Sequence, residues 1–264
     1  MLKGSGRVKI GFIGMGNMAQ AILRGFLSNK CVKKENVFAY APSREKLMHN
    51  AVNIGFIACA SDEEVCEKSD LVFIACKPYQ IEDVLKKCKD PLKGKAIVSI
   101  AAGWGFDKYE ALIPDTRIQT VMPNTPVAVG EGVVLFEEKN TLTEDELKTV
   151  RKYFESTGIV ETVPGNLMGI AGTLTGCGPA FVDLFIEAYA DAGVKYGLKR
   201  DQAYRLVSAM IKGSASLQLA TGKHPGVLKD EVCSPGGTTI RGVTTLERDG
   251  FRNACIESID SILK

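Results

Sequence analysis

A glycine-rich turn follows the first apolar run of the chain, in the stretch GFIGMGNMAQAI. Gly14, Gly16 and Ala19 have the spacing G-x-G-x-x-A, after an apolar run at 8–13 and before a helical pattern that starts about Asn17. In a strand–turn–helix of this kind, the glycines allow a tight turn and a close approach to pyrophosphate, which the helix N–H groups bind. The alternative is a glycine turn in an α/β protein that binds no nucleotide. We expect a dinucleotide site.

The rest of the N-terminal half alternates short β-rich runs with helical patterns. This alternation is typical of a Rossmann-like, doubly wound parallel sheet in an α/β fold. Two further β-rich runs, RIQTVMP and GVVLFEE, extend the expected sheet. Thr143 and Glu146 then open a helical pattern with the spacing of a capping box. The alternating segments are, in order, RVKIGFI, NMAQAILRGFLSN, NVFAYA, REKLMHNAVNIG, DLVFIAC, IEDVLKKCK and AIVSIAA.

The pattern changes near Pro164, where β-rich runs stop and helical periodicity continues from Leu167 to the C-terminus. We therefore expect two domains, a dinucleotide-binding Rossmann domain at 1–163 and an all-helical substrate and dimerisation domain at 164–264. The stretch 165–182 carries no charged residue, but its glycines, proline and polar residues favour a buried segment of a soluble protein over a membrane span.

Charge and cysteine content argue against several classes of protein. Lys and Arg number 33 against 31 Asp and Glu, without basic blocks, so no nucleic-acid partner is expected. The 8 scattered cysteines lack a Cys-x-x-Cys pair and there are 2 histidines, so no metal site is expected. The N-terminal stretch lacks the apolar core of a signal peptide, and free thiols fit the cytoplasm.

The small and apolar residues of 167–221 exceed what a few lone helices can cover, which predicts a dimer.

The second β-rich run ends without the acidic residue that normally binds the ribose 2′-hydroxyl of NAD. Ser43 and Arg44 stand there instead and could hold a 2′-phosphate, which predicts NADPH as the cofactor, with NADH as the alternative. Arg44 could also be an ordinary solvated charge at a helix start. The segments 75–80 and 100–104 follow later strands and should line the same cleft. Lys77 is either a second cation for the nucleotide or a plain turn residue.

Two polar loops are candidates for the substrate side of the site. In VMPNTP, prolines bracket Asn124 and restrict the backbone, so the loop could orient a nicotinamide or a substrate; the alternative is a generic turn. In SPGGTT, the hydroxyls and glycine amides from Ser234 to Thr239 precede a helical pattern that starts near Ile240. Such an arrangement forms an anion cradle, unless it is only a helix cap on an ordinary loop.

Several motifs along the chain are shared with one known family: GMGNMA at 14–19, CKP at 76–78, MPNTP at 122–126, TGCGPAF at 175–181 and SPGGTT at 234–239. Together they resemble pyrroline-5-carboxylate reductases over nearly the whole chain, and SPGGTTIRGVTTLE with the upstream HPGVLKDEV is the most specific part. The resemblance implies reduction of 1-pyrroline-5-carboxylate to L-proline with NADPH or NADH, the last step of proline biosynthesis. It also implies an N-terminal Rossmann domain and a C-terminal all-α dimerisation domain, hence a homodimer that could assemble further.

The resemblance also assigns residues to the two sides of the site. The substrate is a cyclic imine with a carboxylate, so the loop would hold the carboxylate and Thr239, the predicted catalytic residue, would hydrogen-bond to the ring nitrogen. The proline-bracketed loop described above places Asn124 on the substrate side. Some relatives differ at PNTP, and Cys177 stands where serine is frequent, so neither position supports a catalytic role. The matching cofactor residues are Gly14, Gly16, Asn17, Met18, Ser43, Ala75, Lys77, Pro78 and Ala101, and the matching substrate residues are Ser234, Gly237, Thr238 and Thr239.

Two other functions compete with this one. A β-hydroxyacid dehydrogenase also joins a Rossmann domain to helices, but it uses a lysine in a helix after a glycine-rich loop, and TGCGPAF offers none. A non-catalytic NADPH-binding module would lack a shaped anion loop such as SPGGTT.

Overall fold

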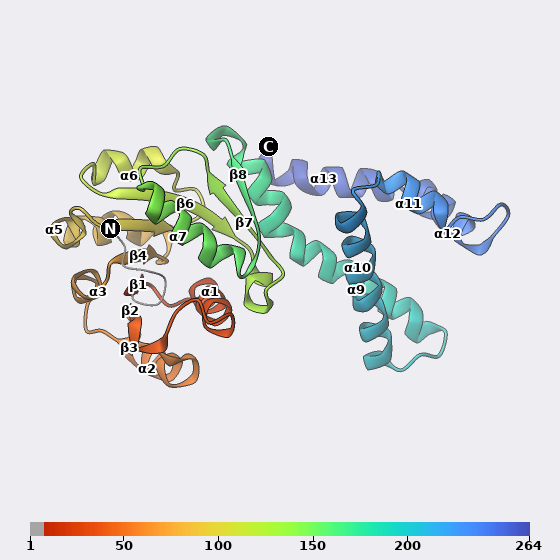
Figure 1. Ribbon diagram of the computed structural model, residues 1–264. Helices are drawn as coiled ribbons and strands as arrows, with labels where there is room; N and C mark the ends of the chain where they lie inside the picture. Colours follow the sequence, from red (N-terminus) through yellow and green to blue (C-terminus); the bar gives the residue numbers. More distant parts are fainter. Residues whose placement is uncertain (1–7) are drawn as a thin grey trace. The chain divides into compact units, whose positions relative to one another are not determined.

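The computed structural model describes residues 8–264, which form two compact units, one ending at Gly176 and the other running from Cys177 to Lys264. The first unit is α/β and the second is built from helices alone (Figure 1). The prediction about a signal peptide concerns residues outside the described range. The units divide within the helical stretch that follows the last strand, beyond the composition change near Pro164, and the domain limits 1–163 and 164–264 stay a prediction.

The first unit contains an 8-stranded sheet in the order β3-β2-β1-β4-β5-β6-β7-β8. Neighbouring strands are parallel except β6 and β7, which are antiparallel. The carboxyl end of β1 at Ile13 lies between Tyr40 of β2 and Ile74 of β4, where the strand order reverses. This confirms the doubly wound sheet. The strands are β1 Ile10–Ile13, β2 Val37–Tyr40, β3 Ile57–Ala58, β4 Leu71–Ile74, β5 Ala96–Ser99, β6 Arg117–Pro123, β7 Gly132–Glu137 and β8 Gly158–Val163.

Helices connect the strands and form all of the second unit. The helix after the glycine turn begins at Asn17, as expected. The helices of the first unit are α1 Asn17–Ser28, α2 Arg44–Asn50, α3 Asp62–Lys68, α4 Ile81–Lys87, α5 Lys89–Leu92, α6 Phe106–Leu112, α7 Glu144–Glu155 and α8 Met168–Gly172. Those of the second unit are α9 Gly178–Lys195, α10 Arg200–Thr221, α11 Pro225–Glu231, α12 Thr238–Arg248 and α13 Phe251–Leu263. Shorter turns are η1 Lys34–Asn36, η2 Ala51–Gly55, η3 Pro78–Gln80, η4 Thr125–Val129, η5 Gly165–Leu167 and η6 Thr173–Cys177.

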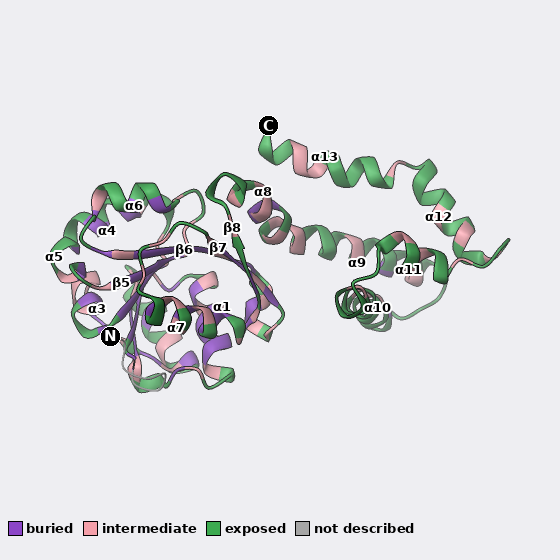
Figure 2. Cartoon of the chain, turned by 45° about the horizontal axis from the view of Figure 1, so that its top comes forward, coloured by how far each residue is buried: buried purple, intermediate pink, exposed green. Residues whose placement is uncertain are grey.

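Apolar residues cover both faces of the sheet, because side chains alternate between the faces along each strand. β1 and β4 are buried along their whole length. On one face, the rings of Phe12 and Phe73 stack with centroids 4.8 Å apart, and Phe26 of α1 and Phe154 of α7 pack beside Phe73. On the other face, α3, α4, α5 and α6 form a second apolar cluster around Ile74. Figure 2 shows the buried residues concentrated in this unit.

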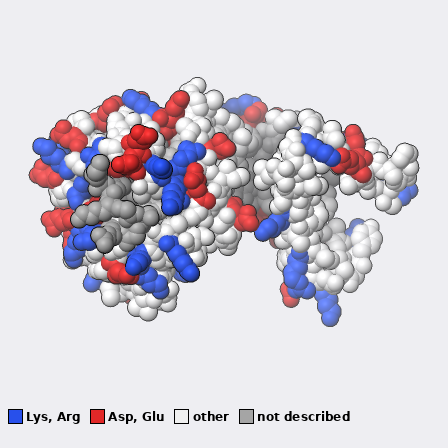
Figure 3. Space-filling model, in the orientation of Figure 1, with Lys and Arg blue, Asp and Glu red and all other residues white. Residues whose placement is uncertain are grey.

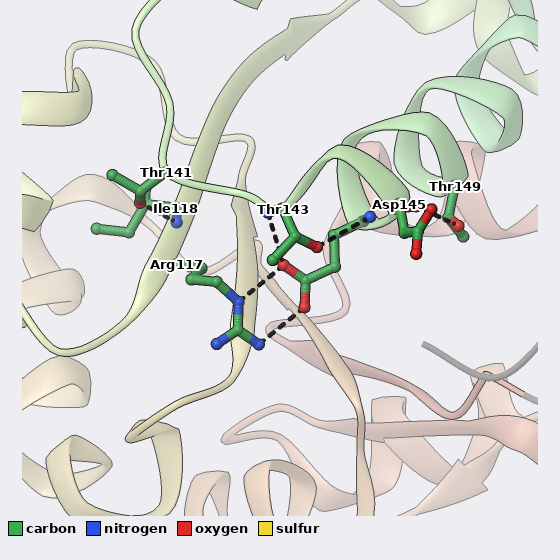
Figure 4. A network of polar contacts seen from close by, with 7 residues as sticks. Arg117, Ile118, Thr141, Thr143, Asp145 and Thr149 are labelled. Atoms are coloured by element: carbon green, nitrogen blue, oxygen red, sulfur yellow. Dashed lines mark hydrogen bonds and ion pairs between the residues drawn. The ribbon is translucent and has the colours of Figure 1, made fainter. Parts of the chain in front are cut away.

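One buried carboxylate fixes α7 to the sheet. Thr143 and Glu146 form the predicted capping box, in which Thr143 Oγ1 accepts from the Glu146 N–H at 3.3 Å and Glu146 Oε2 accepts from the Thr143 N–H at 3.0 Å. Arg117 of β6 donates to both carboxylate oxygens, at 2.7 and 2.8 Å (Figure 4). Burial opposes ionisation of this carboxyl group, but the hydrogen bonds from Arg117 and Thr143 outweigh it and lower the pKa of Glu146.

Replacing Glu146 with alanine is expected to lower the free energy of unfolding by about 2–4 kcal/mol at neutral pH, because Arg117 and the Thr143 N–H lose their acceptor. The folded-state pKa is lowered, so this contribution is present above the ordinary carboxyl pKa and is lost as the pH falls through the folded-state value. Urea unfolding across acidic pH measures the difference. The control Glu155→Ala removes an exposed pair with Arg151 on the same helix and should cost less than about 1 kcal/mol. Equal losses of unfolding free energy in the two variants would contradict the proposed stabilising role of Glu146.

The second unit has almost no interior of its own. Among residues 177–264, all of which the structure describes, Ala190 of α9 and Ala203 of α10 are the buried ones. Figure 3 shows mostly uncharged surface on the visible face of these helices. Large apolar side chains that are more than half exposed include Leu184, Leu206, Leu217, Leu219, Val232 and Ile256.

The expectation that 165–182 is a buried segment is wrong for the single chain. Phe181 is 37% exposed and Val182 is 43% exposed, because no other part of the unit covers them. Within the described residues, Gly165–Lys195 is long and apolar enough to cross a membrane, by length and composition only. One such helix is weak evidence for a membrane span.

Candidate active site

The turn between β1 and α1 requires glycine at its first position. Gly14 has a φ of +96°, and a Cβ there would lie 2.6 Å from the backbone of Ala75. Its N–H donates to the Tyr40 carbonyl at 2.8 Å, which fixes the turn against the end of β2. A Cβ on Gly16 would meet nothing within 4 Å, so this side of the turn faces open space. A phosphate group can therefore approach the backbone at Gly16.

The N-terminus of α1 lies at the same place with its N–H groups available. No side chain of the described residues caps it, and its first turn carries no acidic residue. Ala19 is 1% exposed and packs into the core, which keeps the helix close to the sheet. Because uncapped N–H groups and the helix dipole favour anions, this geometry fits a pyrophosphate.

A cavity of about 780 Å³ opens at the carboxyl ends of β1, β2 and β4. Open α/β sheets bind their ligands at this position. The predicted cofactor residues that line it are Gly14, Gly16, Asn17, Ser43, Ala75 and Lys77. Among the described lining residues, Met18, Arg44, Pro78 and Ala101 do not occur, and their roles stay predictions. Tyr79 lines the cavity as part of the segment 75–80, which was expected there, whereas the sequence patterns did not identify the lining residues Gln20, Lys46, Asp62, Asp83 and Lys87.

The cavity wall beside β2 carries a cation, Lys46, one turn after Ser43. Residues three apart share a helix face, whereas adjacent residues do not, and this spacing from Ser43 could have identified Lys46. Arg44 is exposed, and its Nη1 donates to the carbonyl of Cys59 at 3.0 Å. The structure thus brings Ser43 and Lys46 together at the cavity and places the Arg44 guanidinium against another segment.

The loop after β4 forms another wall of the cavity. The Lys77 N–H donates to Gln80 Oε1 at 3.1 Å and so closes the turn, while the Lys77 side chain is exposed. Cys76 also lines the cavity, and burial, followed by the charge of Asp62, raises the pKa of its thiol to about 11. A thiol with this pKa is protonated at neutral pH, so Cys76 does not provide a thiolate nucleophile.

Asn124 lies directly after β6 and is 6% exposed. Its Nδ2 donates to the Thr175 carbonyl at 3.0 Å, and its Oδ1 accepts from the Val133 N–H at 2.8 Å. Both ends of the amide are therefore engaged in holding β6, β7 and η6 together. The structure gives Asn124 a positioning role, and its predicted contact with substrate stays a prediction.

The SPGGTT loop forms a tight turn at the start of α12. The Gly237 N–H donates to the Ser234 carbonyl at 3.0 Å, and Gly236 has a φ of +69°. The helix begins at Thr238, directly after the extended residue Gly237 and earlier than the expected start near Ile240. No described side chain caps this N-terminus.

Thr238 and Thr239 occupy the first turn of α12 and are exposed. Among the hydrogen bonds of the described residues, none engages their hydroxyl groups, whereas Thr244 and Thr245 on the same helix both bond to the Arg241 carbonyl. Hydroxyls and N–H groups at a helix start are suited to an anionic ligand. The predicted substrate residues from Ser234 to Thr239 are thus together on the second unit, whereas Asn124 and the predicted cofactor residues are on the first.

Residues 8–264 contain no cluster of His, Cys, Asp and Glu side chains suited to a metal ion. The first unit offers phosphate-binding backbone and cations at its cavity, and the second offers hydroxyl groups at the start of α12. Phosphate-binding backbone and cations are suited to a dinucleotide, and hydroxyl groups at a helix start are suited to a small anion.

Comparison with known proteins decides the family. Residues 165–264 match the family model described as pyrroline-5-carboxylate reductase dimerisation, and residues 9–103 match that of NADP oxidoreductase, coenzyme F420-dependent. The pyrroline-5-carboxylate reductase of Treponema pallidum is 42% identical over 97% of this chain and 99% of its own length. This chain belongs to the pyrroline-5-carboxylate reductase family. The family member of Escherichia coli is 40% identical over 97% of this chain and 96% of its own length.

The fold of the chain agrees with solved structures of the same family. The pyrroline carboxylate reductase of Plasmodium falciparum, solved with NADP bound, has a TM-score of 0.89 and is 35% identical, over 97% of this chain and 95% of that one. The enzyme from Coxiella burnetii has a TM-score of 0.86 at 28% identity, over 97% and 96% of the two chains. These relatives confirm the resemblance that the motifs predicted.

Proposed function

We propose that this member of the pyrroline-5-carboxylate reductase family reduces 1-pyrroline-5-carboxylate to L-proline with NADPH. The observation that carries the proposal is the pair of anion sites in one chain, a dinucleotide cavity on the sheet unit and an uncapped hydroxyl-rich turn at Ser234–Thr239 on the helical unit. The relatives that are named pyrroline-5-carboxylate reductase span nearly the whole chain and support the same substrate.

On the cofactor side, the chain binds and orients a dinucleotide. The Gly14–Gly16 turn and the N–H groups of α1 hold the pyrophosphate, and Ser43 and Lys46 hold the 2′-phosphate. When bound, the dihydronicotinamide supplies the hydride. Lys77 and Ala75 line the cavity where the strand order reverses, the expected crossing point of the dinucleotide.

On the substrate side, the amides and hydroxyls of Ser234, Gly237 and Thr238 hold the carboxylate. The Thr239 hydroxyl hydrogen-bonds to the ring nitrogen and sets the orientation of the C=N bond. The hydride adds to the imine carbon, and the nitrogen keeps the proton of the iminium form, so the product is a neutral secondary amine before it takes a proton from water. An iminium accepts hydride readily, and this agrees with a site that has no His or Glu acid–base pair in its loop.

The function is tested by cofactor oxidation with the purified protein. Racemic 1-pyrroline-5-carboxylate and NADPH should give rapid loss of the reduced-nicotinamide absorbance, while 3-hydroxy acids with NADP in the reverse direction should give none. Turnover of the hydroxy acids would favour the β-hydroxyacid dehydrogenase alternative. NADPH binding without turnover of either substrate would favour a non-catalytic module.

Replacing Lys46 with methionine is expected to raise the KM for NADPH by about ten- to hundredfold, because a charge-assisted contact to the 2′-phosphate is lost. The KM for NADH should hardly change, since NADH has no phosphate there. Steady-state kinetics with both cofactors measure the effect. Arg44→Met is the matched comparison, and a selective loss of NADPH affinity in this variant alone would support Arg44 in place of Lys46.

We also propose that the protein is a homodimer that forms through its helical unit and could assemble further. The matched family model describes a dimerisation domain, and the unit buries only Ala190 and Ala203 in the single chain. We propose as well that the substrate is a small molecule and that the protein has no nucleic-acid or membrane partner. We expect its location to be the cytoplasm. The free state of the cysteines, from Cys31 to Cys255, agrees with a reducing compartment.

A further inference from the structure

The dinucleotide cavity contains an acidic side chain that phosphate binding does not explain. Asp62 is the first residue of α3 and lines the cavity together with Tyr79 and Val84. A carboxylate repels phosphate groups, so it weakens their binding unless it contacts another part of the ligand. Asp83 lines the cavity too, but it is exposed to solvent, whereas Asp62 is half-buried.

The cavity corresponds to the adenosine half of a dinucleotide site. Its lining residues come from the ends of β1, β2 and β4 and from α1, α2, α3, η3 and α4, and none of the described ones comes from the ends of β5 or β6. In a doubly wound sheet, the half built on the first strands binds the first mononucleotide, and the fingerprint turn binds the pyrophosphate. Leu47, Val84 and the 81% exposed ring of Tyr79 supply the apolar and aromatic surface against which a flat base packs.

Asp62 lines this base region, and so does one cation whose charge acts on it, Lys87. Within residues 8–264, no hydrogen bond or ion pair engages the Asp62 carboxylate. Its charge acts on Cys76, which lines the same cavity after β4. Burial, followed by the charge of Glu63, raises the pKa of Asp62, and the charge of Lys87 offsets only part of this effect.

The start of α3 does not need Asp62 for its own stability. Ser61 Oγ accepts from the Glu64 N–H at 3.2 Å and so caps the helix. The Glu64 carboxylate accepts from the Ala60 N–H and from Lys68, both at 2.5 Å. The helix start is therefore already capped and carries other acidic residues, so a purely structural role leaves the presence of Asp62 in the cavity lining unexplained.

We propose that Asp62 recognises the adenine base of the cofactor by accepting a hydrogen bond from its exocyclic amino group. An ionised carboxylate can only accept hydrogen bonds, and adenine presents a donor at the position where hypoxanthine presents a carbonyl oxygen. Two facing acceptors repel each other, so Asp62 is a specificity-determining residue for adenine over hypoxanthine. This inference rests on the proposed use of NADPH.

The test compares NADPH with its hypoxanthine analogue, in which a carbonyl oxygen replaces the 6-amino group. Dissociation constants come from titration of the reduced-nicotinamide fluorescence with the full-length wild type, Asp62→Asn and Glu63→Gln. The wild type should bind NADPH about ten- to hundredfold more tightly than the analogue. Asp62→Asn should bind the analogue more tightly than the wild type does, because the amide can donate to the carbonyl oxygen. Glu63→Gln removes the same charge beside Asp62 and should keep the wild-type ratio.

Equal binding of the two dinucleotides by the wild type would overturn the inference and leave the proposed function intact. An Asp62→Asn variant that weakens both dinucleotides by the same factor would also overturn it, since damage to the fold changes both constants together. A wild type that bound neither dinucleotide would contradict the proposed function itself, and with it this inference.

Discussion

Replacing Thr239 with valine should lower kcat/KM for 1-pyrroline-5-carboxylate by about ten- to hundredfold. Valine keeps the shape of threonine and deletes the hydroxyl, and a hydrogen bond to a charged group contributes about 1.5–3 kcal/mol. Thr239 lies in the exposed first turn of α12, so the substitution should leave the fold unchanged. The dissociation constant for NADPH should hardly change, because the cofactor cavity is on the other unit.

Thr245→Val is the matched control for this experiment. It makes the same chemical change on the same helix, but the Thr245 hydroxyl donates to the Arg241 carbonyl at 3.0 Å and is outside the loop. Its kcat/KM should equal that of the wild type. If Thr239→Val keeps the kcat/KM of the wild type, Thr239 has no role beyond starting the helix. If Thr239→Val loses affinity for NADPH, the proposed division of the site between the two units is contradicted.

Replacing Leu184 with glutamate should abolish the dimer at micromolar protein and unfold much of the helical unit. Leu184 is 67% exposed on α9 in the single chain, so in the proposed dimer the substitution buries an unpaired charge. Such a charge costs several kcal/mol, which raises the dissociation constant by about a thousandfold or more. Sedimentation velocity measures the assembly, and amide hydrogen exchange measures the protection of α9 and α10.

The control for the interface is Val52→Glu, at an apolar residue of the sheet unit that is 82% exposed. This variant should sediment like the wild type, since we place the interface on the helical unit. A wild-type protein that sediments as a folded and active monomer would contradict the dimer, because α9 to α13 bury too few side chains to fold alone.

We predicted six strands of the sheet from the sequence but named no segment for β3, β8, α3 or α6. β3 is the two-residue strand Ile57–Ala58 at the edge of the sheet, and Ile57 is 41% exposed, so its apolar signal is short and weak. α3 did carry a signal, because Ser61 and Glu64 have the spacing of a capping box and Ser61 caps the helix. Missing α3 also hid Asp62, which the structure places in the cavity.

Within the candidate site, the sequence predicted the turn between β1 and α1 best, because the conformation of this turn depends on its glycines. The positive φ of Gly14 and the open space at Gly16 follow from the G-x-G-x-x-A spacing. Side-chain assignments beside β2 were harder, because the orientation of α2 decides whether Arg44 or Lys46 faces the cavity. The burial of 165–182 could not be predicted for one chain, because a composition pattern does not say whether a residue is covered by its own chain or by a partner.

The central claim is that the chain transfers a hydride from NADPH to the imine carbon of 1-pyrroline-5-carboxylate. NADPH that carries deuterium at the transferred position of nicotinamide C4 tests it most directly, with the product analysed by nuclear magnetic resonance and mass spectrometry. The proposal predicts L-proline with one deuterium per molecule, located at proline C5, and one NADP formed for each proline. Proline without deuterium, or NADPH consumed without proline, would contradict the claim.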